Sequence, residues 1–187
     1  MRVVVGLGNP GRRYQRTPHN VGFDVIELLA RNEGARLRRS LRFRAKLVRT
    51  GAGDRSWMLV QPQTYMNCSG ETVGPLLTYH RVDVSNLVVV LDDADLPLGR
   101  LRIRGRGGSG GHRGLRSIIE HTGTESFARV RIGVGRRGDD MVNHVLSPFS
   151  ATDRNQADQA IERAADAVRH IFDTGLESAM NEFNAAS

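Results

Sequence analysis

The first twenty residues constrain the fold of this chain more than any other segment. A short apolar run, Val3–Val5, is typical of a buried strand, and a glycine-rich loop over 6–11 ends it. Thr17 is a typical helix N-cap with Pro18 at the first helical position, which predicts a helix over 18–31. A strand, a tight loop and a helix in this order indicate the first unit of an α/β fold.

His19 falls in the first turn of that predicted helix. The positive end of the helix dipole disfavours imidazolium there, so we expect a neutral imidazole that acts as a general base at pH 7. Histidines at helix starts also serve structure alone, and this residue by itself does not decide between the two.

The glycines of the same loop have the spacing of a dinucleotide-binding fingerprint, G-x-G-x-x-G, at positions 6, 8 and 11. That fingerprint opens directly into a helix. Here Pro10 interrupts the loop and the predicted helix begins only near Pro18, which argues against a dinucleotide site.

Apolar runs and helical periodicity alternate along the rest of the chain. We expect strands over 3–7, 41–49, 56–61, 87–92, 99–104 and 129–134, and further helices over about 69–80, 113–121, 153–173 and 176–183. With 187 residues and no linker or repeat, the chain is predicted to form one domain over 1–187. We expect an α/β three-layer sandwich, with a mixed twisted sheet and helices on both faces.

Positive charge is the most informative property of the composition. The net charge is +7, and Lys46 is the only lysine. Apolar and basic residues alternate over 41–47, 100–104 and 129–132, which predicts strands with one face in the core and the other face basic. Because arginine binds phosphate bidentately, the three strands favour a nucleic-acid partner over a merely solvated surface.

Other features of the composition narrow the class of protein. The single cysteine, Cys68, excludes an internal disulfide framework and suits a cytoplasmic protein. The sequence shows no secretion signal, no apolar stretch that predicts a membrane span, and no Cys/His cluster with zinc spacing. No spare apolar segment demands a partner chain, so we expect a monomer.

Polar residues follow three of the apolar runs. Asn9, Asn67 and Asp92 each come just after a predicted strand, and if these strands are parallel the three side chains meet His19 in one crevice. Asp92 would then accept a hydrogen bond from one nitrogen of His19 and leave the other as a base. The two asparagines would hold a carbonyl group or the oxyanion formed from it.

Each of these residues has an alternative interpretation. The asparagines also suit plain turns. Asp92 and Asp93, with Asp95, would suit a magnesium site, although Asp95 has the context of a turn residue. Cys68 would suit a nucleophile, but nothing in the sequence indicates a base for it.

The segment from Arg104 to Leu115 contains six glycines, which leave backbone N–H groups open to close approach by a ligand. His112 and Arg113 lie near the end of this segment, at the start of the next predicted helix. We interpret it as a recognition edge.

Several short motifs are spread in order along the whole chain. They are Gly6–Gly11 with Tyr14, His19-Asn20, Pro62 with Thr64–Asn67 and Ser69-Gly70, Asp92-Asp93 with Asp95–Pro97 and Gly99, Gly107–Leu115, Arg129–Gly135, and Val145-Leu146. Together these motifs resemble those of bacterial peptidyl-tRNA hydrolases.

This resemblance implies hydrolysis of the ester that joins a peptide to the terminal ribose of tRNA. It implies that His19 is the general base for water, that Asp92 stabilises its basic form and that Asn9 contacts the peptide. Contacts to substrate or tRNA are implied for Tyr14, Tyr65, Asn67 and Arg113, and contacts to the tRNA 5′-phosphate for Arg104 and Arg131. The implied chemistry needs no metal, no cofactor and no covalent intermediate.

Three residues depart from the family pattern. Arg113 stands where asparagine is usual, Pro18 where arginine is common, and Leu91 where histidine is frequent. Arg113 bears on how the peptide or the tRNA end is held. The alternative function is a non-catalytic RNA-binding protein of the same fold, which loss of His19, Asp92 or Asn9 would indicate; all three are present.

Overall fold

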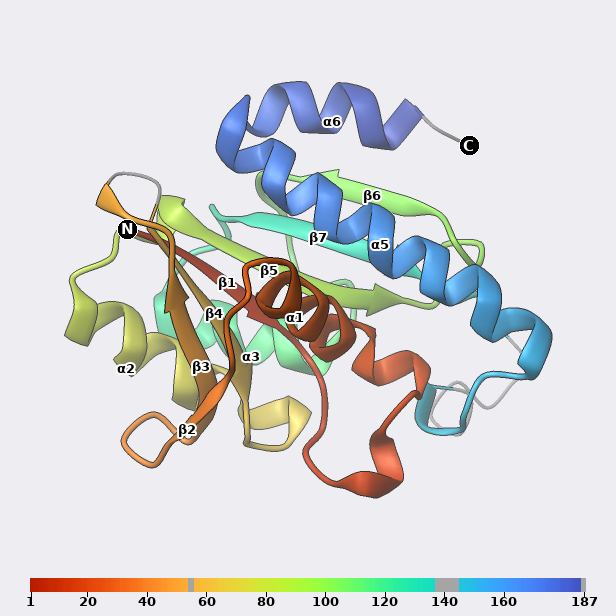
Figure 1. Cartoon of the computed structure of the whole chain (residues 1–187), viewed down its shortest axis with the longest axis horizontal. Helices are drawn as coiled ribbons and strands as arrows, with labels where there is room; N and C mark the ends of the chain where they lie inside the picture. Colours follow the sequence, from red (N-terminus) through yellow and green to blue (C-terminus); the bar gives the residue numbers. More distant parts are fainter. Residues whose placement is uncertain (54–55, 137–144, 186–187) are drawn as a thin grey trace.

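A seven-stranded sheet forms the centre of the computed structural model, which describes residues 1–53, 56–136 and 145–185 (Figure 1). The strand order is β2-β3-β4-β1-β5-β7-β6. Strand β1 runs parallel to β4 and β5, and β5 runs parallel to β7, whereas the outer pairs are antiparallel. The strands are β1 (Arg2–Gly6), β2 (Arg38–Ser40), β3 (Ala45–Thr50), β4 (Trp57–Pro62), β5 (Leu87–Asp93), β6 (Leu101–Arg104) and β7 (Ala128–Gly133).

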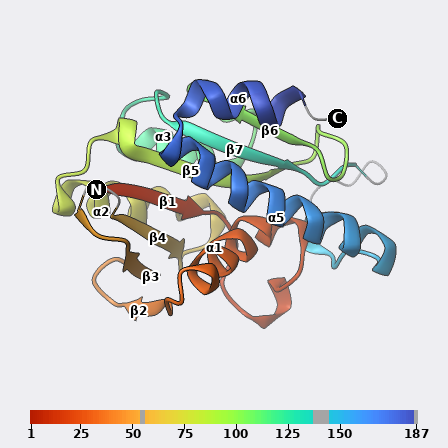
Figure 2. The ribbon, with the colours of Figure 1, turned by 45° about the horizontal axis from the view of Figure 1, so that its top comes forward.

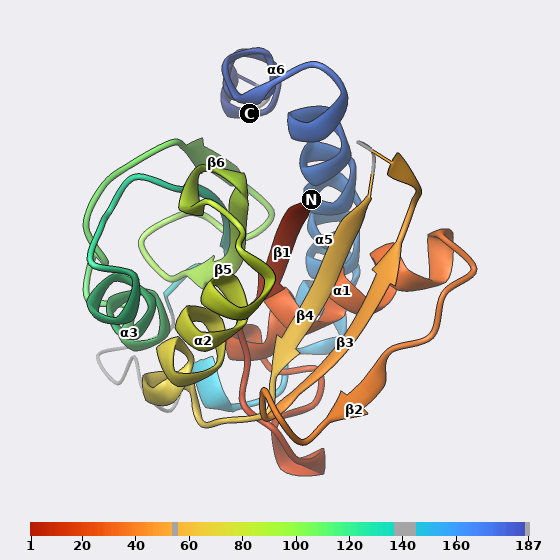
Figure 3. The same ribbon diagram turned by 90° about the vertical axis from the view of Figure 1, so that its left-hand side faces the viewer.

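Helices cover both faces of this sheet, so the predicted three-layer α/β sandwich is confirmed. One face carries α1 (Val21–Asn32), α5 (Ala151–Asp173) and α6 (Leu176–Ala185), and Figure 2 shows α5 crossing the sheet beside α1. The other face carries α2 (Gly70–His80) and α3 (Arg113–Thr122), and the three layers are seen edge-on in Figure 3.

The central strands are apolar throughout because both of their faces are buried. In β1, Val4 packs on the side of α1 and α5, whereas Val3 and Val5 pack on the side of α2. In β5 all seven residues are buried, including Asp92 and Asp93 at its end. This continuous burial explains why the apolar runs predicted these strands well.

The predicted strand over 41–49 is wrong in its first half. Residues 41–44 form a turn between β2 and β3, and Arg44 has a positive φ of 50°. The turn brings Arg39 opposite Lys46 in an antiparallel pair. Phe43 is buried although it lies in the turn. The alternation of apolar and basic residues therefore continues through the turn as it would along a strand.

The predicted basic strand faces are confirmed for β6 and wrong for β7. Arg102 and Arg104 are exposed on β6. On β7, Arg129 is only 1% exposed, and the side chain of Arg131 is 14% exposed. Strand β7 lies inside the sheet, and the glycine-rich loop over 105–112 covers its arginines.

One sheet edge is covered and the other is open. Asn184 of α6 accepts a hydrogen bond from the Ile103 backbone N–H (2.7 Å) and donates one to the Ile103 carbonyl (3.1 Å), which covers the edge at β6. Strand β2 at the opposite edge has no such cover among the described residues. Within the same residues, no helix has both the length and the apolar character needed to cross a membrane.

The backbone of α1 approaches β1 very closely. A Cβ atom at Gly22 would lie 2.5 Å from the Leu7 nitrogen and 2.6 Å from the carbonyl oxygens of Leu7 and Val90. The Leu7 N–H donates to that Val90 oxygen (2.9 Å). The start of α1 therefore packs directly against the backbone of β5 and of the residue that follows β1.

We predict that Gly22→Ala destabilises the fold by about 1–3 kcal/mol, the usual cost of overpacking a close-packed contact. The free energy of unfolding in urea measures this cost. Gly108→Ala is the control, since its Cβ would meet only Glu125 Oε1, at 3.5 Å, and should leave stability within about 0.5 kcal/mol. A Gly22→Ala protein as stable as the control would contradict the close approach.

Candidate active site

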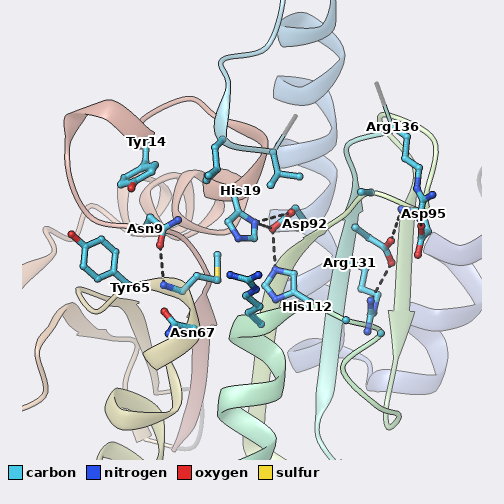
Figure 4. A pocket seen from close by; sticks show the side chains of 18 residues that line it. Asn9, Tyr14, His19, Tyr65, Asn67, Asp92, Asp95, His112, Arg131 and Arg136 are labelled. Carbon is cyan, nitrogen blue, oxygen red and sulfur yellow. Dashed lines mark hydrogen bonds and ion pairs between the residues drawn. The ribbon is translucent and has the colours of Figure 1, made fainter. Parts of the chain in front are cut away.

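A cleft of about 460 Å³ opens at the carboxyl ends of β1, β4 and β5 (Figure 4). The parallel direction of these strands is the condition under which the sequence predicted a common crevice, and it is met. Eight of the nine predicted site residues line the cleft: Asn9, Tyr14, His19, Tyr65, Asn67, Asp92, Arg113 and Arg131. Arg104 does not line it and lies on the exposed side of β6.

His19 and Asp92 are hydrogen-bonded to each other. Asp92 is 4% exposed near the end of β5, and the His19 Nδ1–H donates to its Oδ1 (2.9 Å) and Oδ2 (3.0 Å). The charges and hydrogen bonds of the neighbouring histidines outweigh burial and hold the pKa of Asp92 far below its ordinary value. Asp92 is therefore a carboxylate, and the bond fixes the His19 proton on Nδ1 and leaves Nε2 as an acceptor.

The expected cause of a neutral His19 is wrong. His19 lies in a short 3-10 turn, Pro18–Asn20, ahead of α1, and Thr17 forms no side-chain cap. Burial lowers the pKa of His19, but the charge and hydrogen bond of Asp92 together raise it above 6.5, against a smaller lowering by Arg113. The carboxylate, and not the helix dipole, therefore sets the basicity of this imidazole.

A second histidine shares the same carboxylate. The His112 Nε2–H donates to Asp92 Oδ1 (3.1 Å), and the rings of His112 and His19 lie 5.2 Å apart. The Leu115 N–H donates to His112 Nδ1 (3.2 Å), so His112 also serves as the N-cap of α3. His112 is thereby held as the Nε2–H tautomer, opposite to that of His19.

His112 was not among the predicted site residues. Its position after a glycine run and directly before a helix was noted, but only its contact with Asp92 places it in the site. Residue order could not show that a side chain 20 positions away turns back onto the same carboxylate.

Three hydrogen bonds hold Asn9 in place. Its backbone N–H donates to Asn20 Oδ1 (2.9 Å) and its carbonyl accepts from Asn20 Nδ2 (3.0 Å). Its side-chain oxygen accepts from the Met66 N–H (2.8 Å). With that oxygen engaged, the Asn9 Nδ2 group is the end available as a donor to the cleft. Asn20, buried and unpredicted as a site residue, positions this donor.

Comparison with known proteins identifies the family. The sequence model of peptidyl-tRNA hydrolase matches residues 3–187. The chain belongs to the peptidyl-tRNA hydrolase family.

The similarity to individual relatives covers nearly all of this chain. The peptidyl-tRNA hydrolase of Thermoanaerobacter sp. (strain X514) is 44% identical over 184 residues, covering 98% of this chain and 100% of the relative. That of Geobacillus thermodenitrificans (strain NG80-2) is 42% identical with the same coverage. The crystal structure of the Acinetobacter baumannii peptidyl-tRNA hydrolase superposes with a TM-score of 0.92 at 34% identity, covering 99% of this chain and 95% of that one.

In this member of the peptidyl-tRNA hydrolase family, the buried Arg129 and the partly buried Arg131 hold the glycine-rich loop against β7. Arg129 donates to the carbonyl oxygens of Gly107 and, at 2.8 Å, Glu125. Burial and the charge of Arg131 lower the pKa of Arg129 to about 10. Arg131 donates to Asp93 (3.2 Å) and to the carbonyl of Gly108 (3.3 Å). The arginines thus turn loop carbonyls inward, beside the cleft.

The donor atoms of His19, Asp92 and His112 lie within 4.8 Å of one another, which raises the question of a metal ion. A zinc ion needs each of these atoms at about 2.0–2.2 Å. Here one nitrogen of each histidine donates to the carboxylate, and His112 Nδ1 accepts a backbone N–H. This donor set is satisfied by its own hydrogen bonds and does not fit a cation. Asp93 and Asp95, the other residues of the alternative magnesium site, pair with Arg131 and Arg136 instead.

We predict opposite shifts in the His19 pKa from two substitutions. Asp92→Asn removes the charge that raises this pKa and should lower it, whereas Arg113→Asn removes a charge that lowers it and should raise it. NMR titration of the imidazole measures both, with the intact protein giving a value above 6.5. An unchanged His19 pKa in Asp92→Asn would contradict the assigned cause.

Proposed function

We propose that this chain hydrolyses the ester bond of peptidyl-tRNA, with His19 as the general base. The observation that carries the proposal is the bond from His19 Nδ1–H to the buried Asp92 carboxylate, which leaves Nε2 as the proton acceptor in the cleft. Family membership supplies the substrate, and this geometry supplies a reactive group suited to it.

In the proposed reaction, His19 Nε2 takes a proton from water as the water oxygen attacks the ester carbonyl carbon. The carboxylate of Asp92 stabilises the imidazolium that forms. The tetrahedral intermediate then collapses: the bond to the ribose oxygen breaks, that oxygen receives the proton from His19, and the peptide leaves as its carboxylic acid. Proton and bond counts balance without a metal or a covalent enzyme intermediate.

Asparagine side chains supply the polar contacts in this proposal. The Asn9 amide, oriented by the Met66 N–H, donates to the peptide backbone next to the ester. Asn67 lies exposed at the rim of the cleft, beside the 64% exposed ring of Tyr65. Arg113 on the rim is long enough to reach a phosphate, unlike the asparagine usual in the family.

The tRNA is proposed to approach over β6 and β7. Arg104 is exposed there, and Arg131 lies between Asp93 and the glycine-rich loop at the edge of the cleft. The alternative, a non-catalytic RNA-binding protein of this fold, is not favoured, because the relatives are named as hydrolases and the base and its carboxylate are both present.

We predict that His19→Ala lowers kcat by about 10²–10⁴-fold, the usual contribution of a general base. The assay measures release of the N-acetyl-amino acid from N-acetyl-aminoacyl-tRNA, with unblocked aminoacyl-tRNA as the comparison substrate. Binding of tRNA should be nearly unchanged, since His19 contributes to the reaction and not to the tRNA path. A variant that keeps a third of the original kcat would refute the assignment.

We predict that EDTA leaves this activity unchanged, because the carboxylate and both histidines are engaged with one another. Hydrolysis is measured before and after dialysis against the chelator. Activity lost to EDTA and restored by one particular divalent ion would overturn the metal-free mechanism.

We predict that Arg104→Ala raises KM and leaves kcat unchanged, because a lost phosphate contact acts equally on the ground and transition states. It should flatten the dependence of log K on log[salt] by somewhat under one unit. Arg163→Ala on α5 is the control. If Arg104→Ala matches this control in KM and slope, the proposed path is wrong.

A further inference from the structure

Positive charge is concentrated on the sheet edge opposite β6. Residues 36–49 contain seven cationic side chains and no acidic one, which equals the net charge of the whole chain, +7. This segment is the β2–β3 hairpin with its lead-in, and we call it the basic hairpin. Its cations are Arg36, Arg38, Arg39, Arg42, Arg44, Lys46 and Arg49, all exposed.

These charges are largely unneutralised. Arg44 pairs with Glu71 (2.8 Å), and the other six cations form no ion pair within the described part of the chain. Arg39 and Lys46 lie directly opposite each other in the register of β2 and β3. Like charges in that position destabilise a strand pair. The hairpin therefore tolerates a repulsion that an anionic partner would relieve.

An exposed aromatic ring stands beside the basic hairpin. The Arg42 guanidinium lies 3.9 Å from the centre of the Tyr79 ring, and Tyr79 on α2 is 54% exposed. The ring of buried Phe43 meets Tyr79 edge-on at 5.5 Å, which anchors the pair. Burial and the charges of Arg49 and Arg42 lower the pKa of neighbouring His80, so the positive potential extends across this surface.

The basic hairpin is remote from the proposed tRNA path. Six strand spacings separate β2 from β6, which at about 4.8 Å each amount to about 29 Å. Figures 1 and 3 both show the two strands at opposite ends of the sheet. Arg104 and Arg131 belong to the far end, on β6 and β7.

We propose that the basic hairpin, with Tyr79, is a second RNA-binding surface that contacts the phosphates of an RNA helix other than the tRNA whose ester occupies the cleft. The location of that tRNA rests on the proposed function; the surface itself does not. Guanidinium groups bind phosphates bidentately, and an extended row of them suits a polymer of evenly spaced charges. Tyr79 adds a planar group against which a base or ribose packs.

A charged edge strand also prevents pairing between sheets, and that role explains some of the charge. It does not explain the charges in the turn, such as Arg42, or the guanidinium held over an exposed ring on another element. Those features favour a bound polyanion over protection of the edge alone.

The test compares two variants that each lose two positive charges. Arg39→Gln/Arg42→Gln changes the basic hairpin, and Arg81→Gln/Arg163→Gln changes positions on α5 and after α2 that form no described ion pair. The probe is a blunt RNA duplex without a 3′ overhang, bound at several salt concentrations. The hairpin variant should bind about tenfold more weakly at low salt, with its salt slope flatter by about 0.7–0.9 unit per lost contact. The control variant should bind as the original protein does.

Other readouts separate this surface from the cleft and from other partners. The hairpin variant should keep its melting temperature, and its kcat and KM on N-acetyl-aminoacyl-tRNA should be unchanged. A raised KM on that tRNA would instead assign the surface to the substrate and overturn the proposal. So would duplex binding equal to the control, or a loss confined to anionic vesicles or polyglutamate. If the original protein does not hydrolyse peptidyl-tRNA but its duplex binding depends on the hairpin, the proposed function fails and this surface stands.

Discussion

The site depends on one buried carboxylate that accepts hydrogen bonds from two histidines. Asp92 is removed from solvent at the end of β5, where an unpartnered charge would be costly. His19 and His112 satisfy it from two different elements, and each is fixed in one tautomer as a result. The opposite tautomers have different consequences: His19 keeps a free Nε2, whereas His112 has both nitrogens engaged and joins α3 to the site.

The fold places this carboxylate through close backbone contacts. Gly22 lets α1 approach the loop after β1, and the 3-10 turn that carries His19 directly precedes that helix. Asn20 ties the same turn to the loop that carries Asn9. A small shift of α1 would therefore move His19, the proposed base, and Asn9, the proposed amide donor, together. The packing of α1 on the sheet thus affects the geometry of the proposed reaction.

Sequence patterns predicted most of the helices and strands and most of the residues that were expected to line one cleft, and the failures have physical causes. The apolar runs of β1, β4 and β5 are continuous because both faces are buried, so the strands and their polar ends were recognisable. The alternation around Phe43 suggested one strand, because a buried turn residue imitates the period of a strand. The arginines of β7 were expected on the surface; the covering loop comes from 105–112, and its position depends on tertiary contacts.

The direction of the pKa shift of His19 also could not be predicted from its neighbours in the sequence. A helix start favours the neutral imidazole, but the deciding charge belongs to Asp92, 73 residues away in the chain. The role of His112 was missed for the same reason. Long-range contacts to a shared carboxylate leave no periodic signal in a sequence.

The tautomers of the two histidines test this account most directly. Imidazole ¹⁵N chemical shifts, measured at a pH above the His19 titration, distinguish protonated from unprotonated ring nitrogens. The account predicts a proton on Nδ1 of His19 and on Nε2 of His112, and Asp92→Asn should disturb both assignments. A proton on Nε2 of His19 in the intact protein would leave no acceptor in the cleft and would contradict the proposed general base.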